Sequence, residues 1–379
     1  MSVLLSTEDG WIVSHLGYLN EIYKSVEDEA RTCSLEFNGE VFEINSQFLR
    51  SNQFGKLERG AATVEGVKSK KRKRSDKLSD EDLQQVTAEL FRSSSVRDNN
   101  EAARKASDNF YSQSSEDRSG GFNGCNQSGT PIVTKVGNEK YVFPERCSFY
   151  CYDVRDIGQK LGDTQHDFIL MDPPWWNKFI RRKNERGVQT SYKMMYNEEF
   201  AKIPIDKLLR SDGIVAVWCT NAPSHLNSII NEMFPSWGVQ YAARWYWVKV
   251  TPVFSLSEAA ANLHMVSPIF QRFIFLLQVT QSGKPVCDFN EASGKQPYES
   301  LIFGRRSLEN DVNVPDKKLI VSVPSGIHSH KPPIAEIIKP YLPESPRCLE
   351  IFARYLVPGW TSWGLEVLKF QHLSLYVQR

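Results

Sequence analysis

The chain has 379 residues, with 46 Lys and Arg against 45 Asp and Glu and a formal net charge of +1. This length can bury one large domain with additional segments. The near-neutral balance excludes a global positive field, so any binding of nucleic acid must come from local patches. The seven cysteines are scattered and odd in number, which favours reduced thiols of an intracellular protein over a disulfide framework. Neither a signal peptide nor an apolar run of bilayer length is visible, and we expect no membrane association.

Residues 1–56 are predicted to form a small N-terminal α+β module. Between Cys33 and Ile44, apolar and polar residues alternate around Asn38-Gly39, and an Asn-Gly pair in such a pattern is typical of a β-hairpin. A segment of this size buries too little surface to be stable alone. We therefore expect it to pack on the later part of the chain.

Residues 57–78 are predicted to be a basic flexible linker. The run from Lys68 to Arg74 carries six positive charges in seven residues, and such a run cannot be buried. It fits a nuclear import signal, a nucleic-acid-binding arm or a merely solvated linker. The first of these is favoured, and it predicts a nuclear protein.

Residues 79–130 are predicted to be a helical segment followed by a loop. Ser79 can cap a helix and Asp82 follows three residues later, close to a capping box. Leu83, Val86 and Leu90 then fall on one face of that helix. A second, weaker helix is expected over 98–111, and the Ser-, Gly- and Asn-rich stretch 112–130 is predicted to be a flexible loop.

From residue 131 to 379 the pattern is that of one continuous domain in which strands alternate with helices. Helical patterns cover 223–234 and 332–341, and a G-x-G-x-x-G motif is absent from the sequence. This alternation predicts an α/β fold with a doubly wound, largely parallel sheet. The predicted strands are 149–152, 168–171, 214–219, 245–250, 273–277, 319–323, 349–352 and 363–367.

The most informative motif comes directly after the predicted strand Phe168–Met171, where the chain reads Asp172-Pro-Pro-Trp175. Pro173 and Pro174 cannot donate to a sheet ladder, so the strand ends at Asp172, at the edge where α/β sheets bind ligands. The Asp172 carboxylate and the Pro173 carbonyl could accept both hydrogens of an exocyclic base amine, while Trp175 stacks on the base. The alternative is an Asp-Pro turn with a core tryptophan.

The Asp172–Trp175 motif, with Ser329-His-Lys-Pro332 and Leu349-Glu-Ile-Phe-Ala-Arg354, resembles the MT-A-type (DPPW) adenine N(6)-methyltransferases over residues 147–379. One branch of that family is favoured by Lys295–Arg305. The resemblance implies a permuted Rossmann-like methyltransferase sheet, with 131–379 as the domain that uses S-adenosylmethionine. It also implies methyl transfer to the N(6) amine of adenine.

The resemblance also assigns residues to the S-adenosylmethionine site. Asp153 and Val154 receive the adenine, Lys331 pairs with the methionine carboxylate, and Glu366 takes the ribose hydroxyls. Leu365 stands where some relatives have an amide, so it cannot share that role. We expect no metal, because His328 and His330 lack a third ligand. The remaining predicted cofactor residues are Asp172, Glu350, Phe352 and Arg354, and the predicted catalytic residues are Asp172, Pro173, Pro174 and Trp175.

The substrate is expected to lie along the basic, aromatic loop Trp176–Arg186, whose cations would neutralise phosphates and whose tryptophan would stack on a base. A solvated charged face is the alternative. Because a base inside a duplex cannot reach Asp172, the target must be single-stranded or flipped. The predicted substrate-binding residues are Trp176, Asn177, Lys178, Arg181, Arg182, Tyr192 and Lys249.

The resemblance favours RNA as substrate, most of all 2′-O-methylated adenosine in small nuclear RNA, with adenine in DNA as the second choice. Two other classes remain open. One is a non-catalytic nucleic-acid-binding scaffold of the same family, and the other is a methyltransferase for a small metabolite or protein amine. A monomer is expected, with a partner subunit left open.

Overall fold

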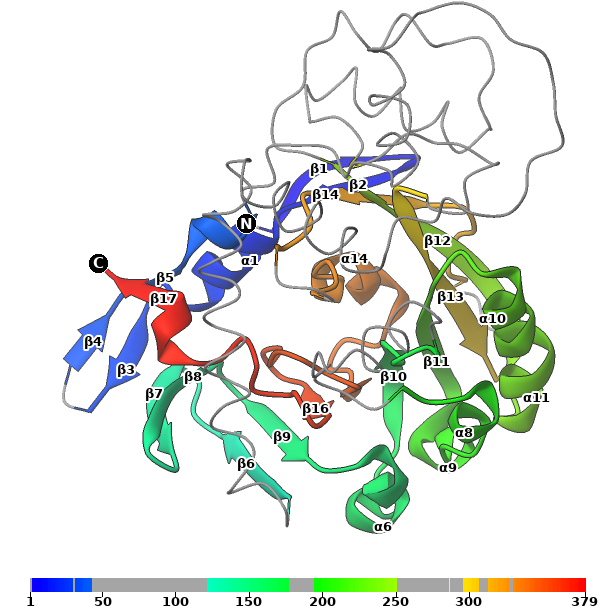
Figure 1. Ribbon diagram of the computed structural model, residues 1–379, viewed down its shortest axis with the longest axis horizontal. Coiled ribbons are helices and arrows are strands. Elements are labelled where there is room, and N and C mark those ends of the chain that lie inside the picture. The colour runs from blue at the N-terminus through cyan, green and yellow to red at the C-terminus, as the bar shows by residue number, and fades with distance from the viewer. Residues whose placement is uncertain are drawn as a thin grey trace, which may run out of the picture.

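The computed structural model describes residues 2–29, 31–42, 121–176, 194–250, 286, 296–306, 313–326 and 330–379. Its centre is an 11-stranded sheet in the order β1-β2-β14-β12-β13-β11-β10-β15-β16-β9-β6 (Figure 1). The predicted basic linker, the predicted helices between 79 and 111 and the predicted strand 273–277 lie outside the described residues. Within them, no helix is long and apolar enough to cross a membrane.

Five neighbouring strands are parallel and form the part of the sheet that carries the site. β10 and β15 are neighbouring parallel strands, although β10 comes about 180 residues earlier in the chain. This order confirms the predicted permuted, Rossmann-like α/β sheet. The strands are β9 (Cys147–Cys151), β16 (Thr361–Trp363), β15 (Cys348–Ile351), β10 (His166–Met171) and β11 (Leu209–Cys219).

The other half of the sheet mixes strand directions. β13 (Tyr298–Arg305) runs antiparallel between β11 and β12 (Gln240–Lys249), and β14 (Leu319–Ser322) runs parallel to β12. Since two antiparallel steps restore the direction, β12 and β14 end at the same edge as β10 and β11. The first residues of β13 lie at that edge too.

Helices cover both faces of the sheet, as a doubly wound fold requires. The helices on one face pack with Ile169 and Met171, and those on the other face pack with Phe168 and Leu170. The first group is α6 (Ile157–Leu161), preceded by the 3₁₀ turn η3 (Val154–Asp156), α8 (Asn197–Ala201), α9 (Ile205–Leu208), α10 (Pro223–Ser228), the π-turn η4 (Ile229–Met233) and α11 (Phe234–Ser236); the second is α1 (His15–Ile22) and α14 (Ala335–Ile338), which continues as η7 (Lys339–Tyr341).

The first 42 residues are built into this fold rather than set beside it. β2 (Gly10–Val13) pairs in parallel with β14, and β1 (Val3–Thr7) closes that edge of the sheet. β3 (Val26–Asp28) and β4 (Arg31–Cys33) form a four-stranded sheet with β7 (Ile132–Val136) and β8 (Glu139–Phe143). The N-terminal residues thus pack on later parts of the chain, as expected, while the domain boundaries themselves stay predictions.

The predicted hairpin at Asn38-Gly39 is wrong. β5 (Leu35–Phe37) pairs instead with β17 (Tyr376–Gln378), which comes after the 3₁₀ turn η8 (Leu373–Leu375) at the other end of the chain. The Asn38 N–H donates to the Leu375 carbonyl, and the Asn38 side chain accepts from the Glu40 N–H and begins the 3₁₀ turn η1 (Gly39–Phe42). Asn38 therefore starts a helical turn and does not reverse the chain into a second strand.

Two further predictions need correction. Part of the predicted loop 112–130 is a strand, β6 (Phe122–Asn126), which pairs antiparallel with β9 while the Asn126 amide donates to the Thr130 and Pro144 carbonyls. The predicted strand 363–367 is displaced: β16 ends at Trp363, and Gly364–Val367 forms a turn closed by the Val367 N–H on the Gly364 carbonyl. That turn brings Glu366 to the functional edge.

We predict that Gly10→Ala disrupts the join between the N-terminal strands and the main sheet. Gly10 has φ +151°, and a Cβ there would lie 2.0 Å from the Leu319 carbonyl oxygen. Because that oxygen belongs to the backbone of β14, the clash cannot be relieved by a rotamer change. We expect a loss of more than about 3 kcal/mol in the free energy of unfolding, measured by urea titration.

Gly137→Ala is the matched control. Its φ is +62°, and a Cβ there meets no heavy atom of the described residues within 4 Å. It should therefore cost only the backbone strain of about 1–2 kcal/mol. Equal losses in the two variants would contradict the clash at Gly10.

Candidate functional site

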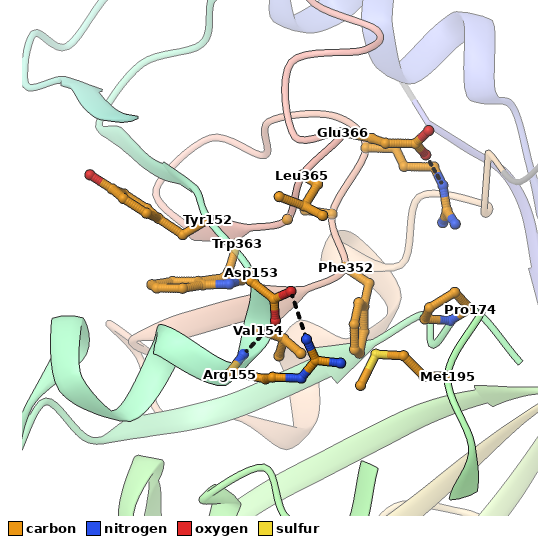
Figure 2. Close-up of a pocket in the computed structure, with 13 residues that line it drawn as sticks. Tyr152, Asp153, Val154, Arg155, Pro174, Met195, Phe352, Trp363, Leu365 and Glu366 are labelled. Atoms are coloured by element: carbon orange, nitrogen blue, oxygen red, sulfur yellow. Dashed lines mark hydrogen bonds and ion pairs between the residues drawn. The ribbon is translucent and has the colours of Figure 1, made fainter. Parts of the chain in front are cut away.

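The parallel strand ends converge on one cavity, which holds about 600 Å³ of space when its open mouth is included. It lies beyond β9, β15 and β16 and beside the Asp172–Trp175 turn. Figure 2 shows Tyr152 and Trp363 on one side, with Pro174 and Met195 on the other. Of the predicted site residues, Asp153, Val154, Pro174, Phe352, Arg354 and Glu366 line the cavity.

Two carboxylates give this largely apolar cavity its polar ends. Asp153 caps η3 by accepting from the Arg155 N–H at 3.0 Å. The Arg155 guanidinium then bridges Asp153 at 3.4 Å and Glu199 of α8 at 3.0 Å. Glu366 accepts from Arg354 Nε at 3.1 Å and lies 3.6 Å from the Lys369 ammonium. Figure 2 marks the ion pairs of Asp153 and Glu366. A carboxylate has about four acceptor positions, so Asp153 can also accept from a ligand hydroxyl or amine.

The turn after β15 combines a rarely adopted backbone conformation with close packing against β16. Phe352 has φ +65°, a conformation that non-glycine residues rarely adopt and that clusters at ligand sites. Its ring packs edge-on against Phe200. At Gly364 a Cβ would lie 2.8 Å from the Ala353 carbonyl oxygen, so only glycine lets the ends of β15 and β16 approach this closely.

Asp172 lies at the centre of a buried ion network. One of its carboxylate oxygens pairs with Arg354 Nη1, and the other lies 3.4 Å from the Lys331 ammonium. Asp172, Arg354 and Lys331 come from the ends of β10 and β15 and from the loop after β14, and Asp172 is only 6% exposed. Burial opposes a charge on Lys331, but attraction by Asp172 and Glu299 outweighs it and raises the pKa of Lys331.

Glu299 is a site residue that the sequence analysis missed. It lies 2.5 Å from Lys331 Nζ and also pairs with Lys249. Burial opposes its ionisation, but the two lysines outweigh this and hold the pKa of Glu299 far below its ordinary value. An acid near the start of an otherwise apolar strand is a signal for it, but only the antiparallel direction of β13 brings it to this edge.

Glu350 does not line the cavity. It faces the other side of β15 from Leu349 and Ile351, it is 3% exposed, and its Oε2 has no hydrogen-bond partner among the described residues. Burial, then repulsion by Asp172, raises the pKa of Glu350 to about 8, against the attraction of Arg354.

These residues fit S-adenosylmethionine. The apolar walls of the cavity suit an adenine ring, and the carboxylates of Asp153 and Glu366 suit its amine and the ribose hydroxyls. Beyond Arg354, the Asp172 carboxylate suits a positively charged centre, and the Lys331 ammonium suits a carboxylate. Each of these assignments is a prediction about a bound cofactor.

The Asp172–Trp175 turn is rigid and internally bonded. The Pro173 carbonyl accepts from the Trp175 N–H at 2.8 Å, which leaves one of its lone pairs for another donor. Trp175 is 7% exposed: its Nε1 donates to the Trp218 carbonyl, and its ring contacts Phe200 and His225. The tryptophan thus ties the turn to β11, and its stacking on a base stays a prediction.

Only part of the predicted substrate surface is described. Trp176 is stacked on Tyr196, with 6.4 Å between ring centroids. The Lys249 ammonium lies 4.5 Å from the centre of the Trp247 ring and pairs with Glu299. Asn177, Lys178, Arg181, Arg182 and Tyr192 lie outside the described residues. Across the part of the chain that is described, no three His, Cys, Asp or Glu side chains are grouped to hold a metal ion.

We predict that Glu350→Gln flattens the pH dependence of stability. With the pKa of Glu350 raised from 4.5 to about 8, the folded state holds a proton that the unfolded state releases. This stabilisation is complete below pH 4.5 and is lost as the pH rises through 8. Wild-type protein should therefore lose a few kcal/mol more than the variant between pH 5 and 8, measured by urea unfolding.

Glu336→Gln removes an exposed carboxylate from the surface of α14 and serves as the control. It should keep the wild-type slope of unfolding free energy against pH. A wild-type slope in Glu350→Gln would show that the folded protein holds no extra proton there.

Comparison with known proteins agrees with this geometry. The sequence profile of the MT-A70 family matches residues 166–267 and 270–366. The N(6)-adenine-specific methyltransferase METTL4 of Homo sapiens is 39% identical over 263 residues, which are 66% of this chain and 48% of the relative. The match to METTL4 confirms the branch suggested by Lys295–Arg305. The chain spans about half the length of the METTL4 relatives that it matches.

Two more distant relatives carry different substrate names. The DNA N6-methyl methyltransferase of Caenorhabditis elegans is 26% identical over 396 residues, 94% of this chain and 95% of the relative. The N6-methyladenosine RNA methyltransferase MTA1 of Pyricularia oryzae is 30% identical over 250 residues, 63% of this chain and 57% of the relative. With a family profile that matches more than half of its residues and the Asp172–Trp175 motif at the end of β10, this chain belongs to the MT-A70 family.

Proposed function

We propose that this protein transfers a methyl group from S-adenosylmethionine to the N(6) amine of adenine in RNA or DNA. The observation that carries the proposal is the place of Asp172, at the end of β10 between Arg354 and Lys331 and beside the cavity that Arg354 lines. Membership of the MT-A70 family supports it. The relatives' names include both RNA and DNA.

The chemical task is to make a poor nucleophile react. The lone pair of an adenine amine is delocalised into the ring. Asp172 would accept a hydrogen bond from one N(6) hydrogen, and the free lone pair of the Pro173 carbonyl would accept one from the other. These two hydrogen bonds would draw the nitrogen towards tetrahedral geometry. Because Arg354 and Lys331 hold the two Asp172 oxygens, the acceptor is in place before the substrate arrives, which is the condition for electrostatic preorganisation.

The cofactor would supply an electrophilic methyl group on its sulfonium. This chain's residues would bring the amine nitrogen to about 3–3.5 Å from that carbon. As the N–C bond formed, the bond between the methyl carbon and the sulfonium sulfur would break and leave a neutral thioether, and one N(6) proton would leave along the hydrogen bond to the Asp172 carboxylate. These steps need neither a covalent enzyme intermediate nor a redox change.

Among substrates we favour RNA, and 2′-O-methylated adenosine in small nuclear RNA above others, on the resemblance to the METTL4 branch. Trp176 and Lys249, with Asn177, Lys178, Arg181, Arg182 and Tyr192, are the proposed contacts to the strand. A single-stranded or flipped adenine is required, because Asp172 is 6% exposed and an amine within a duplex cannot reach it.

The test is transfer of labelled methyl to matched single-stranded oligonucleotides of RNA, 2′-O-methylated RNA and DNA. Asp172→Ala should lower transfer by at least about 10³-fold, because it removes an acceptor that is aimed at the reacting amine. Asp163→Ala, which changes an exposed carboxylate before β10, should retain wild-type transfer. Near wild-type activity in Asp172→Ala would overturn the mechanism.

The same assay separates the other candidates. Label that is confined to one polymer selects the substrate. Binding of S-adenosylmethionine without transfer to any of the oligonucleotides would point to a missing partner subunit or to another acceptor. Failure to bind the cofactor would favour a scaffold. Transfer that oligonucleotides do not compete for would favour a small-molecule or protein amine.

The proposed location is the nucleus, on the basis of Lys68–Arg74. Replacing the six cations of this run by Ser and Gly should abolish nuclear accumulation of the full chain, because import receptors read clustered positive charge. Fluorescence imaging of the tagged protein in cells measures this, and transfer by the purified variant should stay at the wild-type level. Nuclear accumulation of the variant would refute the import signal.

A further inference from the structure

The loop that carries Lys331 lies between β14 and α14. Residues 323–326 and 330–334 on either side of its undescribed centre belong to neither helix nor strand. A loop without a hydrogen-bonded ladder of its own needs outside contacts to fix a side chain within a fraction of an ångström. The described part of the chain supplies such contacts from the N-terminal residues.

Three positions along this loop are held by residues between His15 and Val41. The Ser322 hydroxyl, at the end of β14, lies 3.0 Å from His15 Nε2. The Gly326 N–H donates to the Val41 carbonyl at 2.6 Å. His330, the residue next to Lys331, lies with its Nδ1 3.0 Å from His15 Nδ1.

The pair of histidines is buried and closely packed. His15 is 2% and His330 4% exposed. The His330 ring packs against Phe370 and Tyr355, at centroid distances of 4.4 and 4.8 Å, and Phe42 packs against both histidines. With so many aromatic neighbours, the His330 ring has little freedom to turn away from His15.

The contact between two Nδ1 atoms also fixes the chemistry of the pair. One ring must donate from its Nδ1 and the other must accept, so the accepting imidazole is neutral and carries its proton on Nε2. Burial lowers the pKa of both histidines, that of His330 to about 3. Ser322, which also accepts from Trp247 Nε1 at 2.7 Å, fixes the far side of the His15 ring.

We infer that His15 is a positioning residue for the cofactor site: by bonding His330 and Ser322, it fixes the loop on which Lys331 reaches Asp172 and Glu299. His15 lies outside the residues that the family profile matches. His15 comes shortly after β2, which pairs with β14. The N-terminal segment therefore contacts both β14 and the loop that follows β14. The role of Lys331 towards the cofactor carboxylate rests on the proposed function.

Three substitutions at His15 separate the two bonds. His15→Phe keeps the ring volume and removes both. His15→Asn places an amide nitrogen where Nδ1 stood and can still reach His330, whereas His15→Gln reaches Ser322 and not His330. Leu19→Ala is the control, because Leu19 is buried on the same helix and its side chain has no group that can form a hydrogen bond to Ser322 or His330.

The first measurement is hydrogen exchange of peptides covering 322–334 in the full-length protein. His15→Phe and His15→Gln should speed exchange there about tenfold or more, His15→Asn should restore most of the protection, and Leu19→Ala should leave it unchanged. The second is the Kd of S-adenosylmethionine by titration calorimetry. His15→Phe should weaken binding about tenfold or more in wild-type protein, but should add little in a Lys331→Met background.

The outcomes separate the two ideas. Unchanged exchange in His15→Phe overturns the inference, as does faster exchange with an unchanged Kd while Lys331→Met alone weakens binding. If Lys331→Met leaves the Kd unchanged, the cofactor role proposed for Lys331 fails, and the exchange data still decide whether His15 holds the loop.

Discussion

The pairing of the buried Asp172 carboxylate with two cations is the interaction on which the rest of the site depends. An ionised group at 6% exposure costs several kcal/mol unless it is paired. Its partners, Arg354 and Lys331, come from the segments after β15 and β14. The site therefore exists only when the ends of three strands lie at one edge, and the order of strands in the sheet is what brings them there.

Charge balance extends this constraint beyond Asp172. Among the described residues Lys331 also pairs with Glu299, which pairs with Lys249, while Arg354 also pairs with Glu366. Anions and cations alternate along this chain of contacts, so each buried charge has a counter-charge. The Oε2 atom of Glu350, beside this chain of contacts, has no hydrogen-bond partner among the described residues. The rise of the pKa of Glu350 to about 8 keeps it protonated at neutral pH.

The sequence predicted what depends on neighbours along the chain. Two prolines after an apolar run end β10 whatever its position in the sheet. The position of Asp172 at the end of that strand could therefore be predicted from the neighbouring residues alone. The Asn38-Gly39 prediction failed because β5 is completed by Tyr376–Gln378, and no local pattern reveals a partner more than 330 residues away. Glu299 was missed for a related reason: its value to the site comes from the direction of β13, which is set by pairing with β11 and β12.

The N-terminal strands show why a family profile that begins at residue 166 does not contain the whole structural unit. β14 is buried along its length, and without β2 it would present an open row of backbone donors and acceptors, which is an unstable arrangement for an apolar strand. β2 closes that edge, β1 caps it, and α1 then crosses to the face on which His330 is buried. One continuous N-terminal segment thus covers the sheet edge and also supports the loop that holds Lys331. A change that weakens the pairing of β2 with β14 is therefore expected to disturb the ion pair between Lys331 and Asp172.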